Sequence, residues 1–147
     1  MICIIQRVSS ALVKTGSYES KIGKGVLVLL GVAANDTKLE VTKLANKISQ
    51  LRIFEDENQK MNLNLTDIGG EALVVSQFTL LADCKGGRRP SFTNAASPEL
   101  GKKLYEFFVD EMKRNKVDTK TGVFGAHMKV ELINDGPVTI ILDSRQL

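Results

Sequence analysis

The sequence predicts an α+β fold in which a mainly antiparallel, barrel-like β-sheet is covered by two main helices. Short runs of apolar and β-branched residues, typical of strands, occur in the first third, the middle and the last third of the chain. Two further segments repeat their apolar residues at helical intervals. The resulting order is strands, helix, strands, helix, strands, without the regular alternation of strand and helix that builds a parallel sheet. Because the 147 residues contain no internal repeat or linker, we expect one domain over residues 1–147.

The first third of the chain is predicted to be rich in strands. Ile4–Val8 and Ala11–Lys14 are short extended runs, and Gly16 and Gly23–Gly25 supply the turns around them. Val26–Leu30 is an uninterrupted apolar run with β-branched residues at alternate positions. Such a run is typical of a strand that is covered on both faces.

Two helices are predicted from capping residues and apolar periodicity. Thr37 is followed by Glu40 at the spacing of a capping box, and the next apolar residues fall at helical intervals: Val41, Leu44, Ala45 and Ile48. The second helix begins at Ser97-Pro98-Glu99, where serine can cap the helix and proline occupies its first position. Its apolar face consists of Leu100, Leu104, Phe107, Phe108 and Met112. We expect both apolar faces to cover the sheet as core rather than to bind a partner.

The remaining strands lie on either side of the second helix. Ala72–Val75 predicts a buried strand that ends in Ser76-Gln77-Phe78-Thr79. Met128–Ile133 and Val138–Leu142 are predicted as two strands that flank Asn134-Asp135-Gly136-Pro137, which is a strong turn signal. The proline in this turn permits a cis peptide bond.

Composition narrows the classes of protein. The longest apolar run, Val26–Leu30, is far shorter than the ~20 residues of a membrane span, and Met1–Val8 lacks the order of a signal peptide, so we expect a cytoplasmic protein. Cys3 and Cys84 lie far apart and are expected to be reduced thiols. With His127 as the only histidine, a zinc site is not expected, whereas a carboxylate site for a hard cation stays open.

One loop concentrates positive charge. The net charge of +3 permits a nucleic-acid partner without requiring one. Lys85-Gly86-Gly87-Arg88-Arg89 places three positive charges on a glycine-rich loop, with Phe92 just beyond. Such a loop can follow a phosphate backbone, and the alternative is an ordinary solvated turn.

Standard catalytic motifs are absent, but polar residues follow a buried strand. There is no Gly-x-Ser-x-Gly motif and no P-loop. His127 is expected to be a surface or supporting histidine at a strand start, and Glu55-Asp56-Glu57 to be a solvated loop rather than a glycosidase pair. Ser76, Gln77 and Thr79 interrupt an apolar stretch. They can satisfy the backbone of a turn, or they can line a polar pocket that holds an ester or its oxyanion.

Ser76-Gln77-Phe78-Thr79-Leu80 and Asn134-Asp135-Gly136-Pro137-Val138-Thr139 resemble the two signature motifs of the D-aminoacyl-tRNA deacylase family. Further segments resemble the family in the same order: Gln6-Arg7-Val8, Leu51–Asp56, Lys60-Met61-Asn62 and Gly87–Phe92. The likeness runs from Met1 to about Ser144. The resemblance implies a homodimeric cytosolic editing enzyme that hydrolyses the ester of D-aminoacyl-tRNA, and also mischarged glycyl-tRNA, without a metal or an organic cofactor.

The resemblance also implies roles for individual residues. Gln77, Phe78 and Thr79 would form the catalytic part of a pocket that also contains Ser76. Gly136-Pro137, in cis, would reach into the partner subunit's pocket as a chiral filter. Arg7 would brace that filter, and Phe124 and Met128 would receive the terminal adenosine. Lys85, Arg88 and Arg89 would contact the tRNA backbone.

Three positions depart from the family's usual form: Leu81 stands where an aromatic residue is common, Cys84 where a threonine is common, and His127 where an aspartate is common. Because no base is evident beside Thr79, we favour hydrolysis assisted by the neighbouring hydroxyl of the substrate's ribose over an acyl-Thr79 intermediate. Two other functions remain open, a non-catalytic RNA-binding module that uses the basic loop, and an esterase for small metabolites.

Overall fold

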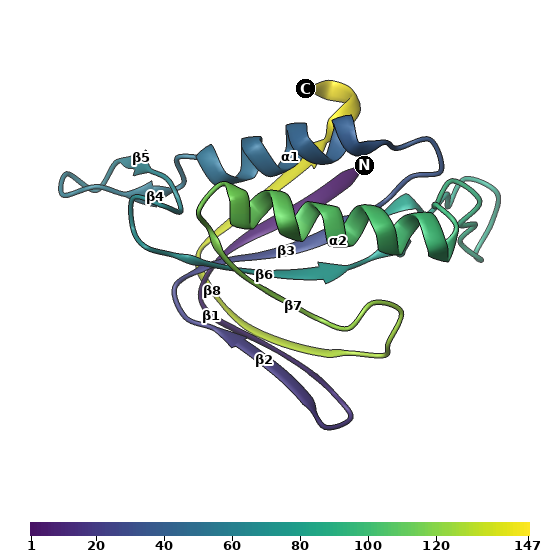
Figure 1. The fold of residues 1–147 in the computed structure, drawn as a ribbon, viewed down its shortest axis with the longest axis horizontal. Coiled ribbons are helices and arrows are strands. Elements are labelled where there is room, and N and C mark those ends of the chain that lie inside the picture. The colour runs from purple at the N-terminus through teal and green to yellow at the C-terminus, as the bar shows by residue number, and fades with distance from the viewer.

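The computed structural model describes all of residues 1–147 and contains a strongly curved, nearly closed sheet with two helices over one face (Figure 1). The sheet has the order β2-β1-β3-β6-β7, with β8 paired to β1. Its strands are β1 (Ile2–Thr15), β2 (Tyr18–Ile22), β3 (Gly25–Gly31), β6 (Glu71–Ser76), β7 (Asp118–Thr121) and β8 (Lys129–Asp143). The helices are α1 (Lys38–Gln50) and α2 (Pro98–Arg114), and a small hairpin is formed by β4 (Phe54–Glu55) and β5 (Met61–Leu63).

The sheet is mixed, so the mainly antiparallel character that the sequence predicted is not confirmed. β1 is antiparallel to β2, β3 and β8, but β3 is parallel to β6 and β6 is parallel to β7. Parallel neighbours need a crossover connection, and α1 and α2 each lie in one of these connections. The second crossover escapes sequence analysis because β7 reads Asp-Thr-Lys-Thr, which has no apolar pattern.

The first and last strands are longer than predicted. Ile4–Val8 and Ala11–Lys14 belong to the single strand β1, and the two strands predicted around Asn134 belong to the single strand β8. Asn134-Asp135-Gly136-Pro137 is therefore not a turn between antiparallel strands. Val8 pairs with Asn134 and Gln6 pairs with Thr139, so Asp135–Val138 bulges out of the ladder opposite Arg7. Turn-forming residues inside a strand are typical of such bulges.

β3 separates two hydrophobic cores, as expected for a strand covered on both faces. Val26, Val28 and Leu30 pack into the larger core, together with the buried residues of α1 and α2. Leu27 packs into the second core, on the opposite face of the sheet, with Val8, Val13, Ile22, Leu73 and Val75. The alternation follows from the two-residue period of a strand.

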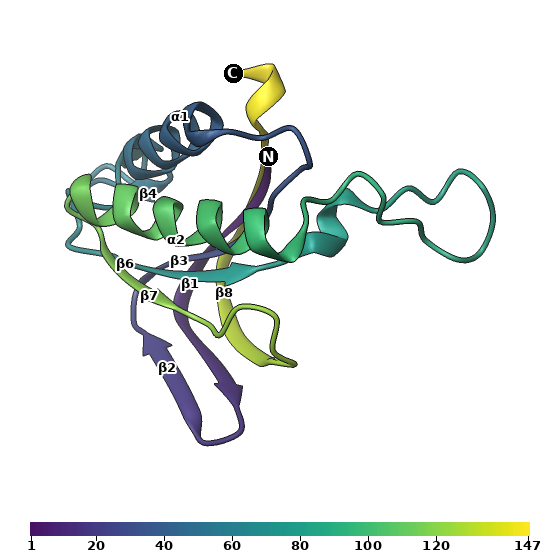
Figure 2. The same ribbon diagram turned by 45° about the vertical axis from the view of Figure 1, so that its right-hand side comes forward.

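Both helices begin where the sequence predicted. Thr37 caps α1 in a capping box with Glu40, whose carboxylate accepts from the Thr37 N–H at 2.8 Å. Ser97 caps α2, and Pro98 occupies its first turn. The helices lie side by side (Figure 2) and contact through residues 69 positions apart, such as Asn115 and Asn46. Neither helix has the length and apolar character needed to cross a membrane.

A polar network closes the sheet near β7. The Lys120 ammonium lies 2.7 Å from a Glu71 carboxylate oxygen and donates to the carbonyl oxygen of Lys21 at 2.8 Å. The other Glu71 oxygen accepts from the Gly23 N–H at 2.6 Å. The hydrogen bond from Lys120 is the main reason that the pKa of Glu71 is lowered. The network ties β7 to β6 and to the end of β2, and so positions the chain that continues from β7.

Candidate active site

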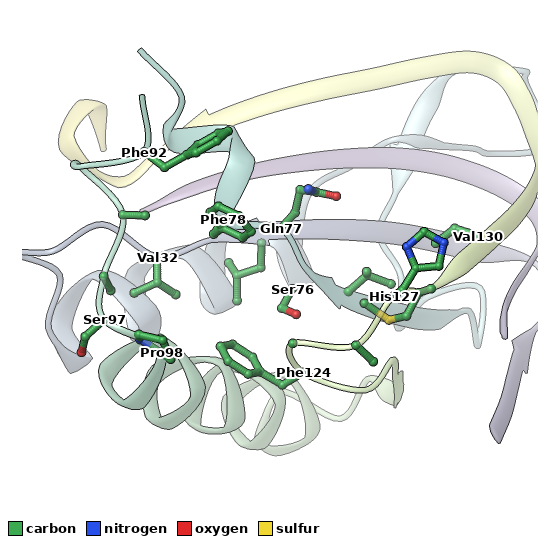
Figure 3. Close-up of a pocket in the computed structure, with 18 residues that line it drawn as sticks. Val32, Ser76, Gln77, Phe78, Phe92, Ser97, Pro98, Phe124, His127 and Val130 are labelled. Atoms are coloured by element: carbon green, nitrogen blue, oxygen red, sulfur yellow. The ribbon is translucent and has the colours of Figure 1, made fainter. Parts of the chain in front are cut away.

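A cavity of about 610 Å³ lies beside the carboxyl ends of the parallel strands β3, β6 and β7 (Figure 3). Segments that follow these strands form its wall with the start of α2 and of β8. The lining residues are Leu30, Val32, Val75, Ser76, Gln77, Phe78, Phe92, Ala95, Ala96, Ser97, Pro98, Gly101, Phe124, Gly125, Ala126, His127, Met128 and Val130. Ligands of parallel sheets bind outside the carboxyl ends of the strands, so the position marks this cavity as the candidate site.

Of the three polar residues at and after the end of β6, two line the cavity. Ser76 and Gln77 line the cavity, whereas Thr79 does not but is joined to Gln77 by a hydrogen bond from the side-chain amide to the threonine hydroxyl. No side chain of the three makes a hydrogen bond to a backbone group. Of the two readings left open by the sequence, this arrangement favours a polar pocket over satisfaction of a turn.

The short 3-10 helix η1 (Phe78–Leu81) holds this polar group against β3. The Gln77 N–H donates to the Leu30 carbonyl oxygen at 2.8 Å. A Cβ atom at Gly31 would lie 2.6 Å from Leu81 Cδ2 and 3.0 Å from the Gln77 carbonyl oxygen. Only glycine at position 31 lets η1 lie this close to β3. The N–H groups of Phe78 and Thr79 open η1, where a helix leaves its first donors without an intrahelical acceptor.

One aromatic wall of the cavity stands on α2. The Phe124 ring lies 5.7 Å from the Tyr105 ring, and a Cβ atom at Gly101 would be 3.3 Å from Phe124 Cζ. Tyr105 donates its hydroxyl proton to the Val74 carbonyl oxygen at 2.8 Å, and burial raises its pKa. Met128 lines the same cavity as Phe124. Phe124 is thus backed by a buried, hydrogen-bonded neighbour.

A second aromatic wall faces the first. Phe78 and Phe92 meet edge to face with ring centroids 5.1 Å apart. Figure 3 shows them across the cavity from Phe124, with Ser76 between the two walls. The chain that carries Phe92 is held beside the end of β3, because the Ala96 N–H donates to the Val32 carbonyl oxygen at 2.9 Å. The cavity can therefore accept flat groups at two places.

His127 is the only ionisable side chain among the lining residues. It is exposed, makes no hydrogen bond within the chain, and lies two residues before β8 begins at Lys129. This fits the expected surface histidine at a strand start, although its place on the cavity wall was not anticipated. All the other lining residues are uncharged.

The second signature motif lies outside the cavity of its own chain. The peptide bond between Gly136 and Pro137 is cis, as the resemblance implied, and neither residue lines the cavity. The Arg7 guanidinium, 5% exposed, donates from Nε to the Asp135 carbonyl oxygen at 2.9 Å and from a terminal nitrogen to the Ile53 carbonyl oxygen at 2.6 Å. Arg7 thus supports the bulge that carries Gly136.

The basic loop projects from the body of the protein near the cavity but does not line it (Figure 2). Asp83 and Ser91 close its base through two backbone hydrogen bonds of 2.8 and 2.9 Å. Lys85, Arg88 and Arg89 are exposed, and none of them forms a salt bridge. The sequence therefore located three unpaired positive charges correctly, and the fold places them on one projecting segment.

The acidic run is a solvated turn, as predicted. Asp56 lies in the β4–β5 hairpin and accepts from the Asn62 side chain at 2.6 Å and from the N–H groups of Asn58 and Lys60. These hydrogen bonds, that from Asn62 first, lower its pKa. No group of three or more His, Cys, Asp or Glu side chains lies close enough together to hold a metal ion.

Sequence analysis missed several residues of the site. Phe92 fell within a segment that resembles the family but received no role, and Ala95, Ala96 and Gly101 gave no chemical signal. The signal that could have identified Phe92 was its position just after a basic, glycine-rich loop. The small residues could not have been identified, because their contribution is the space they leave beside Phe124 and β3.

Comparisons with known proteins agree with one another. Residues 4–143 match the family model described as D-Tyr-tRNA(Tyr) deacylase. The chain is 55% identical over 148 residues to the D-aminoacyl-tRNA deacylase of Thermosipho africanus, with 100% of this chain and 99% of that protein covered. It is 59% identical over 145 residues to the D-aminoacyl-tRNA deacylase of Clostridioides difficile, with 98% and 97% covered.

Two solved structures share the fold. The c-Myc DNA Unwinding Element Binding Protein is 40% identical, with a TM-score of 0.89 and coverage of 97% of this chain and 98% of that one. A probable eukaryotic D-amino acid tRNA deacylase has a TM-score of 0.83 over 96% of this chain and 97% of that one. At 16% identity, this second likeness shows the fold alone.

The close approach at Gly31 generates a stability prediction. Gly31→Ala should lower the free energy of unfolding by about 1–3 kcal/mol, because the methyl group must displace Leu81 and the Gln77 carbonyl group. Urea unfolding measures the change. Gly86→Ala is the matched control, since a Cβ atom there meets nothing within 4 Å. Equal stability of the two variants would contradict the proposed packing of η1 on β3.

Proposed function

This chain belongs to the D-Tyr-tRNA(Tyr) deacylase family, and on that basis we propose that it hydrolyses the ester between a D-amino acid and the terminal ribose of tRNA. The observation that carries the proposal is the cavity itself. Ser76 and Gln77 line it, Thr79 adjoins Gln77 through a hydrogen bond, and the exposed His127 is its only ionisable lining side chain; no metal cluster is present. Such a site suits a substrate that brings its own reactive hydroxyl. We place the activity in the cytoplasm, where tRNA is charged.

The aromatic wall at Phe124 and the polar residues Ser76 and Gln77 suggest how the ester is oriented. The terminal adenosine would lie against Phe124 and Met128, where stacking on an aromatic ring is tolerant of sequence and worth roughly 1–3 kcal/mol. The aminoacyl group would then lie beside Ser76 and Gln77. The backing of Phe124 by Tyr105 and its contact with Gly101 support this assignment, because they hold the ring in one place.

The chemical step needs positioning more than a strong base. A water oxygen would add to the ester carbonyl carbon, and the bond from that carbon to the ribose oxygen would break as this oxygen gains a proton. The neighbouring ribose hydroxyl is placed to assist that transfer, and such intramolecular assistance can be worth large effective molarities. The N–H groups of Phe78 and Thr79, which open η1, are suited to hold the developing oxyanion. Gln77, the side-chain partner of Thr79, is not a base.

Chirality would be read by the second motif across a dimer interface. Gly136 and Pro137 do not line the cavity of their own chain, and they lie on β8, which is paired only to β1. Long free edges with exposed apolar residues favour association. On β8, Ile133 is 63% exposed and Ile141 is 69% exposed. These features support a homodimer in which the bulge of one subunit enters the cavity of the other.

A rigid wall of this kind can discriminate enantiomers by shape. The hydrogen atom and the side chain on the α-carbon exchange places between D- and L-amino acids. Proline has a fixed φ and no N–H, and glycine before it lets the backbone approach closely, so the wall would exclude the L side chain without recognising the D side chain. Glycine has no side chain to exclude, and we therefore propose glycyl-tRNA as a further substrate.

The basic loop would contact the rest of the tRNA. Lys85, Arg88 and Arg89 are exposed and free of acidic partners, as phosphate-binding residues are. A non-catalytic RNA-binding module would use the same loop, and the first experiment below separates the two functions.

The proposed activity predicts chiral, metal-independent hydrolysis. Purified protein with a chelator present should release D-tyrosine from D-tyrosyl-tRNA and leave L-tyrosyl-tRNA largely intact, as measured by release of the labelled amino acid. Equal cleavage of both esters would indicate an unselective esterase. Binding of tRNA without cleavage would indicate an RNA-binding module, and activity lost to the chelator would contradict a metal-free mechanism.

The chemical step predicts unequal effects of two deletions. Thr79→Ala should leave measurable hydrolysis, slowed by about tenfold or less, because loss of one hydrogen bond costs only about 1 kcal/mol. A substrate whose terminal ribose lacks the free hydroxyl should not be hydrolysed detectably. Single-turnover rates on both substrates measure the difference. Detection of an acyl group on Thr79 by mass spectrometry would overturn the substrate-assisted mechanism.

The chiral filter predicts that a monomer is inactive. Ile133→Asp should produce a folded monomer without deacylase activity, because the exposed face of β8 would carry a charge into the interface. Leu39→Asp is the matched control, since Leu39 is 59% exposed and lies on α1 rather than on β8. Light scattering gives the mass and the ester assay gives the activity. A monomeric variant that keeps full activity and the preference for D-substrates would contradict the cross-subunit filter.

A further inference from the structure

Two exposed aromatic rings at the cavity are left unused by the proposed placement of the substrate. Phe78 is 57% exposed and Phe92 is 36% exposed, although both belong to the cavity wall. Their edge-to-face contact covers one face of one of the two rings and leaves the other faces free of this contact. Phe124, to which the adenosine is assigned, stands at the opposite wall (Figure 3). An exposed aromatic pair of this kind is a candidate binding surface.

The chain directly before Phe92 is the basic loop, here called the basic lobe (residues 83–91). The Asp83–Ser91 hydrogen bonds join its two ends, so the lobe and Phe92 are presented together. The one carboxylate in the lobe, that of Asp83, accepts from the Lys85 N–H at 2.9 Å. The three positive side chains of the lobe form no salt bridge. Cationic groups and an open aromatic ring are therefore neighbours.

We propose that Phe92 and the basic lobe form a second nucleotide subsite, which binds the nucleotide before the terminal adenosine of a single-stranded 3′ end. The base stacks on Phe92, and the phosphates on either side of this nucleotide face the cations of the lobe. The inference rests on the proposed function, because it takes the terminal adenosine and its ester as the occupants of the rest of the cavity.

Charge complementarity selects this occupant over two others. Proteins that hold single-stranded nucleic acid combine a positive surface for the backbone with aromatic rings for successive bases. The side chain of an amino acid varies in polarity and has no need of three cations beside its site. A second copy of this chain, which the proposed dimer brings to the cavity through Gly136-Pro137, has a net charge of +3 and so does not supply the negative charge that the three cations match. A nucleotide matches both the ring and the charge.

The test compares two esters that differ by one nucleotide. D-Tyrosyl esters of adenosine and of the dinucleotide cytidylyl-adenosine are hydrolysed by wild-type protein and by Phe92→Ala. The dinucleotide ester should have the lower wild-type KM, by a factor between about 5 and 150, which is the range for one stacked base. Phe92→Ala should remove this advantage, so that its KM for the dinucleotide ester equals its KM for the adenosine ester. Phe92→Tyr should retain the advantage, and Leu39→Ala serves as the control for loss of an exposed apolar group.

Other outcomes assign the ring differently and overturn the subsite. If Phe92→Ala also raises KM for the adenosine ester, and does so differently for D-tyrosyl and D-alanyl substrates, the amino-acid side chain lies on Phe92. A change of mass in solution with unchanged KM would place Phe92 at a contact between copies. Equal KM values for the two esters in the wild type would exclude any second nucleotide subsite.

Salt dependence separates the ring from the lobe. On whole D-tyrosyl-tRNA, Arg88→Ala with Arg89→Ala should reduce the slope of log KM against log salt, whereas Phe92→Ala should raise KM and keep the slope, because stacking releases no counterions. If the wild type cleaves neither ester, the proposed function fails. Equilibrium binding of uncharged cytidylyl-adenosine and adenosine to the same variants then decides the subsite by itself.

Discussion

Parallel pairing of β3, β6 and β7 is the constraint on which the rest of the structure depends. Parallel neighbours require long crossovers, and the two crossovers contain α1 and α2, which lie together over one face of the sheet. The three strands then end at the same edge. Gln77 and Phe124 follow two of these strands and Val32 follows the third, so residues far apart in sequence meet in one cavity. The position of the site is thus a consequence of strand direction.

A buried charge organises the other signature motif. The Arg7 guanidinium is almost fully buried, and a buried charge without acceptors would cost several kcal/mol. Its acceptors are the carbonyl groups of Ile53 and Asp135, which come from the start of the β4–β5 region and from β8. The hydrogen bond from Arg7 to the Asp135 carbonyl oxygen therefore holds the bulge of β8 away from the ladder. The same side chain limits Gly136, where a Cβ atom would lie 3.3 Å from an Arg7 nitrogen.

Local signals were sufficient for elements that are determined by neighbours in the chain. The Thr37 and Ser97 caps, the apolar run of β3 and the solvated turn at Asp56 all appear where the sequence predicted them. Each of these depends on groups a few residues apart. The place of Ser76 and Gln77 beside an apolar strand left a turn and a polar pocket open, the family resemblance implied the pocket, and both residues line the cavity.

The sequence by itself determined the two helices, the apolar strand segments, the basic loop and the residues of the two motifs, whereas the polar strand β7, strand direction, the bulge and the cavity wall were decided only by tertiary structure. β7 is polar, so it can be recognised as a strand only from its pairing with β6. Asn134–Pro137 has the composition of a turn, and only pairing of both halves of β8 with β1 makes it a bulge. Gly31, Gly101 and Phe92 matter through what lies beside them in space. The physical reason is that composition and periodicity report contacts along the chain, while these features depend on partners distant in the sequence.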